Sequence, residues 1–233
     1  MKSRSILLYT TSLVCGVQMM AQEHNLVVPD TTAPKISYGI RFGGDLSKLL
    51  RTAVDADYSG FEVMGDLRFS KRFYAAMELG YEDRVWDQSQ VRSAINGSYI
   101  KIGADFNAYN NWKGMDNAIS TGLRYGLARF ANTLETYPIY TTDPTYPTVL
   151  RTEPIEFTGL TAGWLEFILA IRTEVWSHFY LSVHVQLKHM INETKPENFD
   201  NLIVPGFNKT NDYSAFGVGY GYSLTYYLPL LKR

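Results

Sequence analysis

The sequence has one cysteine, few charged residues and, beyond its N-terminus, no long hydrophobic run. One cysteine cannot build a disulfide framework or a cysteine-based zinc site. Charged residues make up 19% of the 233 residues, and 22 Lys and Arg nearly balance 23 Asp and Glu, so the basic excess of a nucleic-acid-binding protein is missing. The lack of an apolar run of about 18 residues argues against a helical membrane span in the main part of the chain.

The N-terminus has the features of a secretory signal peptide over residues 1–21. Two basic residues open it, an apolar stretch follows over residues 6–17, and Ala21 is a small residue suited to cleavage. A lipoprotein signal at Cys15 is the alternative, but the bulky Val14 occupies the position where such a signal needs a small residue. We therefore expect cleavage after Ala21, which removes the cysteine.

From residue 36 onward, apolar and polar residues alternate in eight segments, as they do in β-strands with two unlike faces. In the last segment glycines and other small residues face one way, and large apolar residues face the other: Phe216, Val218, Tyr220, Tyr222, Leu224, Tyr226 and Leu228. Short connections alternate with long ones, which cover residues 47–58, 83–97, 130–163 and 189–214. The pattern predicts an all-β fold, namely an eight-stranded antiparallel transmembrane β-barrel with short periplasmic turns and long extracellular loops.

An even number of strands places the N-terminal and C-terminal ends of the chain on the same, periplasmic side of the membrane. We expect residues 22–35, which are rich in turn-forming residues, to be a flexible periplasmic lead-in. Residues 36–233 are expected to form the barrel.

The charged residues of the eight segments decide which face of the barrel meets lipid. A soluble ligand-carrying barrel has an apolar interior and a polar exterior, whereas a membrane barrel reverses this arrangement. Here charges of both signs gather opposite the apolar faces, and a charge at the lipid midplane costs about 2–4 kcal/mol. We therefore predict an interior network of paired charges formed by Arg41, Asp45, Glu62, Asp66, Arg68, Glu78, Lys101, Asp105, Arg124, Glu166, Arg172, Glu174, His184 and Lys188. The alternative, a soluble sandwich with packed apolar faces, does not explain these charges together with a signal peptide.

Aromatic residues on the apolar faces are spaced as two belts. Phe61 and Phe69 are eight residues apart in the sequence, which corresponds to roughly 20 Å of membrane height for a tilted strand. The sequence assigns three further residues to the periplasmic belt: Phe73, Phe179 and Tyr226. It assigns two further residues to the outer belt: Tyr81 and Phe216. Because an eight-stranded barrel is filled by its own side chains, we expect no wide pore.

Three motifs carry a resemblance to a known family: Gly39-x-Arg41-x-Gly43-Gly44-Asp45, Gly217-x-Gly219-x-Gly221 and Gly221-x-x-Leu224-x-Tyr226. The last resembles the terminal signal that the barrel-assembly machinery reads. Over residues 36–228 the chain resembles small outer-membrane β-barrels of the OmpA/OmpX-like type, and it is similar to an uncharacterised family of eight-stranded barrels in Bacteroidota. The resemblance implies the cell outer membrane as location and, in that lineage, association with the barrel-assembly complex.

Few residues suggest catalysis. The sequence shows no metal-ligand spacing and no cofactor-binding motif, so we predict no catalytic residue, no metal and no cofactor. His189 is the one position where an outer-leaflet lipid-modifying enzyme could place a base, with Ser214 and Glu193 nearby in the sequence. Such an enzyme needs a positioned nucleophile and an orienting acid, and no motif joins these three residues.

The long connections are better candidates for function. Tyr137, Tyr140 and Tyr146 lie among prolines, and rigid aromatic residues lose little entropy on binding, so this loop suits recognition of a protein or a glycan. The last long loop contains Phe199 and Phe207 and is too apolar to extend into water. It either packs over the barrel mouth or docks onto a partner.

We expect a non-enzymatic outer-membrane barrel whose partners are membrane lipid and other outer-membrane proteins, with no nucleic acid among them. In this hypothesis it is a structural or accessory subunit of an outer-membrane complex, for which the resemblance suggests the barrel-assembly machinery. The alternatives are an autonomous surface barrel for adhesion or envelope integrity and, from a different class, the lipid-modifying enzyme at His189.

Overall fold

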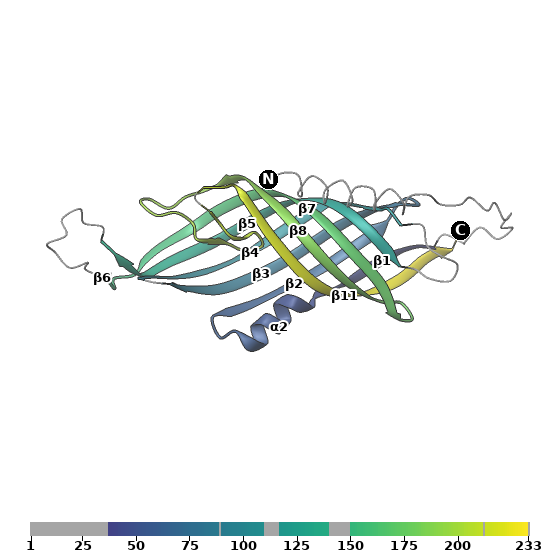
Figure 1. Cartoon of the computed structure of the whole chain (residues 1–233), viewed down its shortest axis with the longest axis horizontal. Coiled ribbons are helices and arrows are strands. Elements are labelled where there is room, and N and C mark those ends of the chain that lie inside the picture. Colours follow the sequence, from purple (N-terminus) through teal and green to yellow (C-terminus); the bar gives the residue numbers. More distant parts are fainter. Residues whose placement is uncertain (1–36, 89, 110–116, 140–149, 212, 233) are drawn as a thin grey trace, which may run out of the picture. The chain divides into compact units, whose positions relative to one another are not determined.

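Eight long antiparallel strands form a closed ring in the computed structural model, in which residues 37–88, 90–109, 117–139, 150–211 and 213–232 are described (Figure 1). The predicted signal peptide and lead-in lie outside these residues. The long strands are β1 (Ser37–Asp45), β2 (Tyr58–Arg68), β3 (Phe73–Gln88), β4 (Val91–Asn107), β5 (Ala118–Pro138), β7 (Ile155–Trp176), β8 (Phe179–Glu193) and β11 (Phe216–Lys232). Each long strand pairs with the next, and β1 pairs with β11. The predicted eight-stranded antiparallel barrel is confirmed.

Four short elements accompany the ring: helix α2 (Leu46–Val54) and the strands β6 (Leu150–Arg151), β9 (Ile203–Val204) and β10 (Asn208–Lys209). Strand β6 pairs with the end of β5, and β9 pairs with β10 in a separate small sheet. All four lie in the connections at the end of the barrel opposite the short periplasmic turns. No helix in the described ranges is long and apolar enough to cross a membrane.

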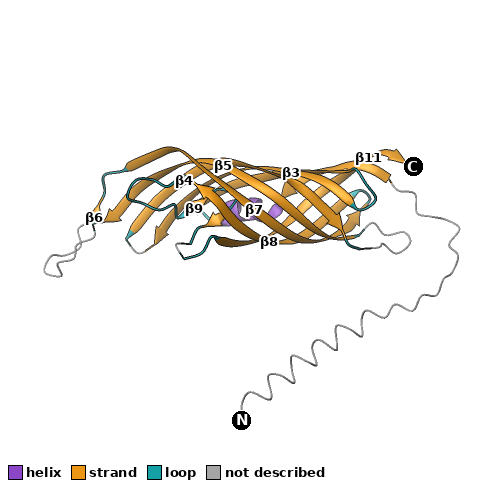
Figure 2. Cartoon of the chain, turned by 90° about the horizontal axis from the view of Figure 1, so that it is seen from above, coloured by secondary structure: helices purple, strands orange, loops and turns teal. Residues whose placement is uncertain are grey.

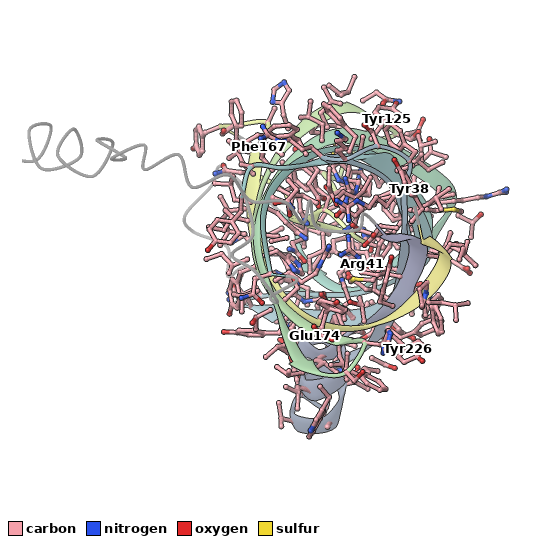
Figure 3. All side chains as sticks on the ribbon, turned by 90° about the vertical axis from the view of Figure 1, so that its right-hand side faces the viewer. Tyr38, Arg41, Tyr125, Phe167, Glu174 and Tyr226 are labelled. Carbon is pink, nitrogen blue, oxygen red and sulfur yellow. The ribbon has the colours of Figure 1, made fainter. Side chains whose placement is uncertain are left out.

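Side chains alternate between the two faces of the wall, as the sequence pattern predicts. Along β3, residues 74, 76, 78, 80 and 82 are buried, and the residues between them are exposed. A view along the barrel shows Arg41 inside the ring and Phe167 and Tyr226 outside it (Figure 3). A barrel with charges inside and an apolar exterior is a transmembrane barrel, and barrels of this architecture belong to outer membranes. The protein is therefore an outer-membrane β-barrel.

The exterior aromatic residues form contacts at two heights along the strands. Near the periplasmic ends, the ring of Phe73 lies 6.2 Å from that of Phe69, and the ring of Phe179 lies 5.0 Å from that of Tyr226. Nearer the other end, the rings of Phe61 and Tyr81 are 6.4 Å apart, and Phe216 packs on His189. Aromatic rings at these two levels are the girdles expected at the two membrane interfaces.

Four neighbouring strands, β3, β4, β5 and β7, rise above the rest of the barrel. Strands β5 and β7 have 21 and 22 residues, whereas about 9–11 residues suffice to cross a bilayer. The prediction of long loops over residues 83–97 and 130–163 was therefore wrong for most of their described residues, which continue the strands. We call this extension the outer wall. It carries β6 and lies at the end of the barrel opposite the C-terminus (Figures 1 and 2).

Helix α2 lies in a connection that the sequence pattern predicted as a loop. Asp45 caps its first turn, because the carboxylate accepts hydrogen bonds from the backbone N–H groups of Ser47 and Lys48 at 2.7 and 3.1 Å. Apolar residues recur at helical spacing along it at Leu46, Leu49, Leu50, Ala53 and Val54. The local sequence therefore favours a helix even within an all-β protein.

The helix replaces part of a strand in the barrel wall. Strand β1 ends at Asp45, opposite Ser223, whereas β11 continues outward to Phe216. The helix follows β1 directly and lies along the flank of the barrel beside β2 and β11 (Figure 1). On the β2 side, the Thr52 hydroxyl bonds to both backbone groups of Gly60, accepting from its N–H at 2.9 Å and donating to its carbonyl at 3.0 Å.

Candidate functional site

The lumen of the barrel is filled by a network of charges centred on Lys101. Its ammonium lies 2.9 Å from Glu78, 3.3 Å from Glu62 and 3.6 Å from Glu166, which come from three different strands. Lysine and all three carboxylates are buried. A lone buried charge would be very unfavourable, so the network holds these strands to one another only while it is complete.

A second group of charges lies on the periplasmic side of this centre. Arg41 donates to Asp66 at 2.8 Å, and Arg172 approaches the same carboxylate at 3.5 Å. Arg124 joins this group to the centre, because it lies 2.8 Å from Asp105 and 3.3 Å from Glu78.

Most of the predicted interior charges therefore meet inside the barrel, and two do not. Arg68 bonds to the carbonyls of Ser70 and Lys71 in the turn after β2. Glu174 is exposed and accepts from the backbone of His178 in the turn before β8. Both residues lie at strand ends, where the alternating pattern continues but the side chains reach the periplasmic turn instead of the lumen.

One charge of the network, Lys48, was not predicted from the sequence. Lys48, on α2, forms an ion pair with Glu82, and it lies 3.8 Å from Glu62. Lys48 lies in the connection predicted over residues 47–58, where the alternating pattern assigns no inward face. Glu82 lies on the inward, polar face that the alternating pattern of its segment predicts.

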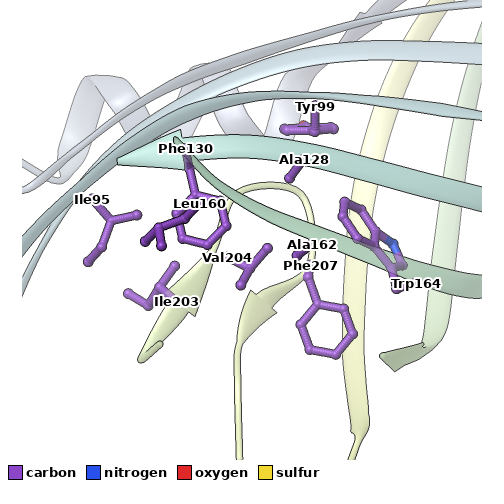
Figure 4. Packing of buried hydrophobic residues seen from close by; sticks show 10 residues of the cluster. All are labelled: Ile95, Tyr99, Ala128, Phe130, Leu160, Ala162, Trp164, Ile203, Val204 and Phe207. Carbon is purple, nitrogen blue, oxygen red and sulfur yellow. The ribbon is translucent and has the colours of Figure 1, made fainter. Parts of the chain in front are cut away.

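An apolar cap covers the extracellular mouth of the lumen. It is made by the connection between β8 and β11, from which Ile203, Val204 and Phe207 enter the barrel and are 2% exposed or less. The Phe207 ring meets Trp164 edge-on at 6.0 Å, and Ile203 and Val204 join the same cluster as Phe130 (Figure 4). Of the two alternatives for this apolar loop, the structure adopts the one in which it packs over the mouth.

Hydrogen bonds join the cap to the charge network at Gly206. Its carbonyl accepts from the ammonium of Lys188 at 2.7 Å, and its N–H donates to Glu82 at 3.4 Å. Lys188 lies 3.8 Å from Glu166, so the cap and the Lys101 centre share one set of charges. Gly206 has a φ of 79°, and a Cβ atom there would come within 2.7 Å of the Tyr99 ring. Glycine is therefore required at this position both for its backbone conformation and for space.

A family model described as a domain of unknown function, DUF6048, matches residues 3–233. The chain belongs to this family. Among solved structures, that of Ail, the attachment invasion locus protein of Yersinia pestis, is similar to this DUF6048 member, with a TM-score of 0.38 and 8% identity over 83% of this chain and 99% of Ail. No curated protein matches the sequence.

The aromatic residues predicted to bind a partner have different positions in this DUF6048 member. Phe207 is buried in the cap, so it is not available to a partner, because its ring fills the barrel mouth. Phe199 and Tyr137 are half-buried near the outer end. Tyr140 and Tyr146 lie outside the described residues.

His189 has no catalytic arrangement around it in the described part of the chain. Its ring packs on Phe216 at 4.6 Å, and its Nδ1 atom is buried without a hydrogen-bond partner. Ser214 accepts from the backbone of Phe216, and Glu193 accepts from Asn201. Neither is hydrogen-bonded to His189 in the structure, and the described residues contain no group of three His, Cys, Asp or Glu that could hold a metal.

Basic residues gather beside the cap, in the outer part of the lumen. The guanidinium of Arg84 and the ammonium of Lys209 both lie over the ring of Trp86, at 5.8 and 4.9 Å. Burial, together with the nearby positive charge of Arg51, lowers the pKa of Arg84. Arg84 and Lys209 form no ion pair with any described carboxylate, which distinguishes them from the lysines deeper in the lumen.

Proposed function

We propose that this protein is a plugged, non-conducting outer-membrane barrel that acts as a structural or accessory subunit and presents its outer wall to another outer-membrane protein. The observation that supports this proposal is the closure of the lumen from both sides of its centre, by charges below and by the cap above. A barrel filled in this way has no room for a transport path. Its function therefore depends on contacts made by its outer surface and not on transport through its lumen.

The outer wall is the surface best suited to a protein partner. Its hairpin tip is fixed by Arg92, which binds Asp87 at 2.8 Å and Glu135 at 2.7 Å and so connects β3, β4 and β5. Charge-assisted hydrogen bonds to Glu135 and Asp87 raise the pKa of Arg92. A surface that is ordered before binding loses little entropy when a partner arrives.

Apolar residues are exposed on this wall above the aromatic girdle. Ile139, Leu150 and Ile155 are large, exposed side chains close to the β5–β6–β7 junction. Exposed apolar groups outside the lipid region are typical of protein–protein contact sites. The family resemblance suggests the barrel-assembly complex as one partner of this class.

The test is an affinity pull-down of the tagged full chain from native outer membranes in mild detergent, followed by mass spectrometry. We expect stoichiometric recovery of another outer-membrane protein, and loss of that protein with the double variant Leu150→Asp/Ile155→Asp. Tyr213→Asp serves as the control, because Tyr213 is also exposed but lies on the β8–β11 connection. Recovery of the chain alone, at monomer size, would overturn the subunit proposal and favour an autonomous surface barrel.

A further inference from the structure

A cavity of about 610 Å³ lies in the barrel wall between α2 and the outer half of β11. It has the exposed side chains of Val54 and Tyr220 on one side and the buried ammonium groups of Lys101 and Lys188 on the other. The cavity therefore connects the lumen with the lipid-facing surface of the barrel. We refer to it below as the lateral cavity.

Strand β11 has an open edge along this cavity. Val218 and Tyr220 are 74% and 76% exposed, whereas their partners on β8, Leu187 and Val185, are 48% and 53% exposed. The difference arises because β11 has β8 on one side and, beyond Ser223, no described strand on the other. An open strand edge at membrane depth is tolerated only beside protein or a polar cavity. The unpaired backbone groups of β11 therefore need a polar group as their hydrogen-bond partner.

The helix on the opposite side of the cavity turns its apolar face outward. Leu49, Leu50 and Val54 are exposed, whereas Lys48 reaches inward to Glu82. In a soluble protein the apolar stripe of an amphipathic helix faces the core. Here the stripe lies at the outer half of the wall, where acyl chains of the membrane are its neighbours.

The cavity is strongly basic. Two acidic residues, Asp45 and Glu62, line it, together with six basic ones: Lys48, Arg51, Arg84, Lys101, Lys188 and Lys209. Arg84 and Lys209 are the two of this set without an ion pair or capping carboxylate in the described structure. A cavity with apolar residues toward the membrane and unpaired cations toward the lumen is complementary to an anionic amphiphile.

We propose that the lateral cavity binds one anionic membrane lipid, with its acyl chains against Leu50, Val54 and Val218 and its phosphate head group against Arg84 and Lys209. The head group supplies acceptors for the two cations and for the open edge of β11. Leu150 and Ile155, the residues tested for partner binding, do not line the lateral cavity, so the site does not rest on the proposed partner.

The experiment uses the full chain, purified in detergent, stripped of lipid and titrated with dioleoylphosphatidylglycerol under native mass spectrometry. We expect one bound lipid per barrel at concentrations where dioleoylglycerol, dioleoylphosphatidylcholine and inorganic phosphate are not retained. The double variant Arg84→Gln/Lys209→Gln is expected to weaken binding at least tenfold. Its control, Arg92→Gln/Lys195→Gln, removes the same charge from cations outside the cavity and leaves binding unchanged.

The apolar half of the site has its own pair of variants. Leu50→Ser/Val54→Ser is expected to weaken binding about tenfold, whereas Leu49→Ser/Ala53→Ser changes the same helix face outside the cavity and leaves binding intact. Unboiled gel mobility identical to that of the unchanged protein shows that each variant is folded.

Four results would overturn the proposal. Equal retention of the anionic, zwitterionic and neutral lipids, or no effect of Arg84→Gln/Lys209→Gln, would identify ordinary surrounding lipid. Inorganic phosphate that competes at the affinity of the lipid would identify a plain anion site. A photo-crosslinker at Tyr220 that captures a polypeptide in native membranes, with no lipid bound to the purified barrel, would identify the open edge as a docking site for a partner strand.

Discussion

At the scale of single residues, Gly206 connects the cap to the charges below it. Gly206→Ala is expected to loosen the cap and to accelerate protease cleavage within residues 196–211, because the new methyl group meets the Tyr99 ring and the backbone has a positive φ. Tyr99 cannot easily move, since its hydroxyl donates to Glu62. Gly159→Ala is the control, because Gly159 has a φ of 72° and no atom within 4 Å of a new Cβ. Equal cleavage rates in the two variants would contradict the packing argument.

Lys101 is the cation that three buried carboxylates of the lumen share. Lys101→Met leaves Glu62, Glu78 and Glu166 close together without their shared cation. We expect a loss of about 3–5 kcal/mol in the free energy of unfolding. The temperature at which the unboiled form loses its faster gel mobility measures this loss. Arg92→Gln, which breaks only exposed ion pairs, is expected to change that free energy by less than about 1 kcal/mol.

In the membrane-spanning part of the barrel, the sequence predicted the interior residues correctly. Above the membrane, the same pattern predicted them poorly. Along β5, Arg124 is inside the membrane part of the barrel, but Phe130 and Leu134 are the buried residues farther out. The wall there turns its apolar face inward to cover the cap, while Arg129 is exposed and Glu135 accepts a hydrogen bond from Arg92. The alternation continues, but its polarity is inverted, and an alternating pattern alone does not reveal which face is inside.

At the scale of elements, Thr52 makes α2 a substitute for a strand. Thr52→Val removes the only side-chain partner that the structure gives to the backbone groups of Gly60. Leaving these groups unpaired is expected to lower the free energy of unfolding by about 1–3 kcal/mol. Faster backbone hydrogen exchange at Gly60 would measure the local effect, and Thr52→Ser, which keeps the hydroxyl, should show no change. A Thr52→Val barrel with unaltered exchange would contradict the substitution of helix for strand.

Helix α2 was predictable in principle, since its apolar residues recur at helical spacing and Asp45 precedes it as an N-cap. It was missed because alternation dominated the neighbouring segments. The end of β1 at Asp45 agrees with the connection predicted from residue 47. The register of β1 against β11, in contrast, has no local signal, because the alternating pattern does not state which residues of two strands lie opposite each other. The lateral cavity depends on that pairing and could not be predicted from the sequence.

At the scale of the whole molecule, two closures at different depths block the lumen: the cap and the Lys101 centre below it. We expect no steady conductance from the purified barrel in planar bilayers. Replacement of residues 200–210 by a short Gly-Ser linker removes the cap, and this variant is also expected to stay closed, because the Lys101 centre lies below the cap. Steady channels in the linker variant would show that the cap alone closes the barrel.

The short pairing of β1 has a consequence for how the ring opens. Strand β1 is matched to β2 only from Ile40 to Gly44, whereas β5 is matched to β7 over almost its entire length. Under mechanical pulling, we expect the contact between β1 and β2 to break first, because it has the fewest paired residues. The ring is therefore joined by the fewest paired residues at β1, and this part of the ring lies beside the lateral cavity.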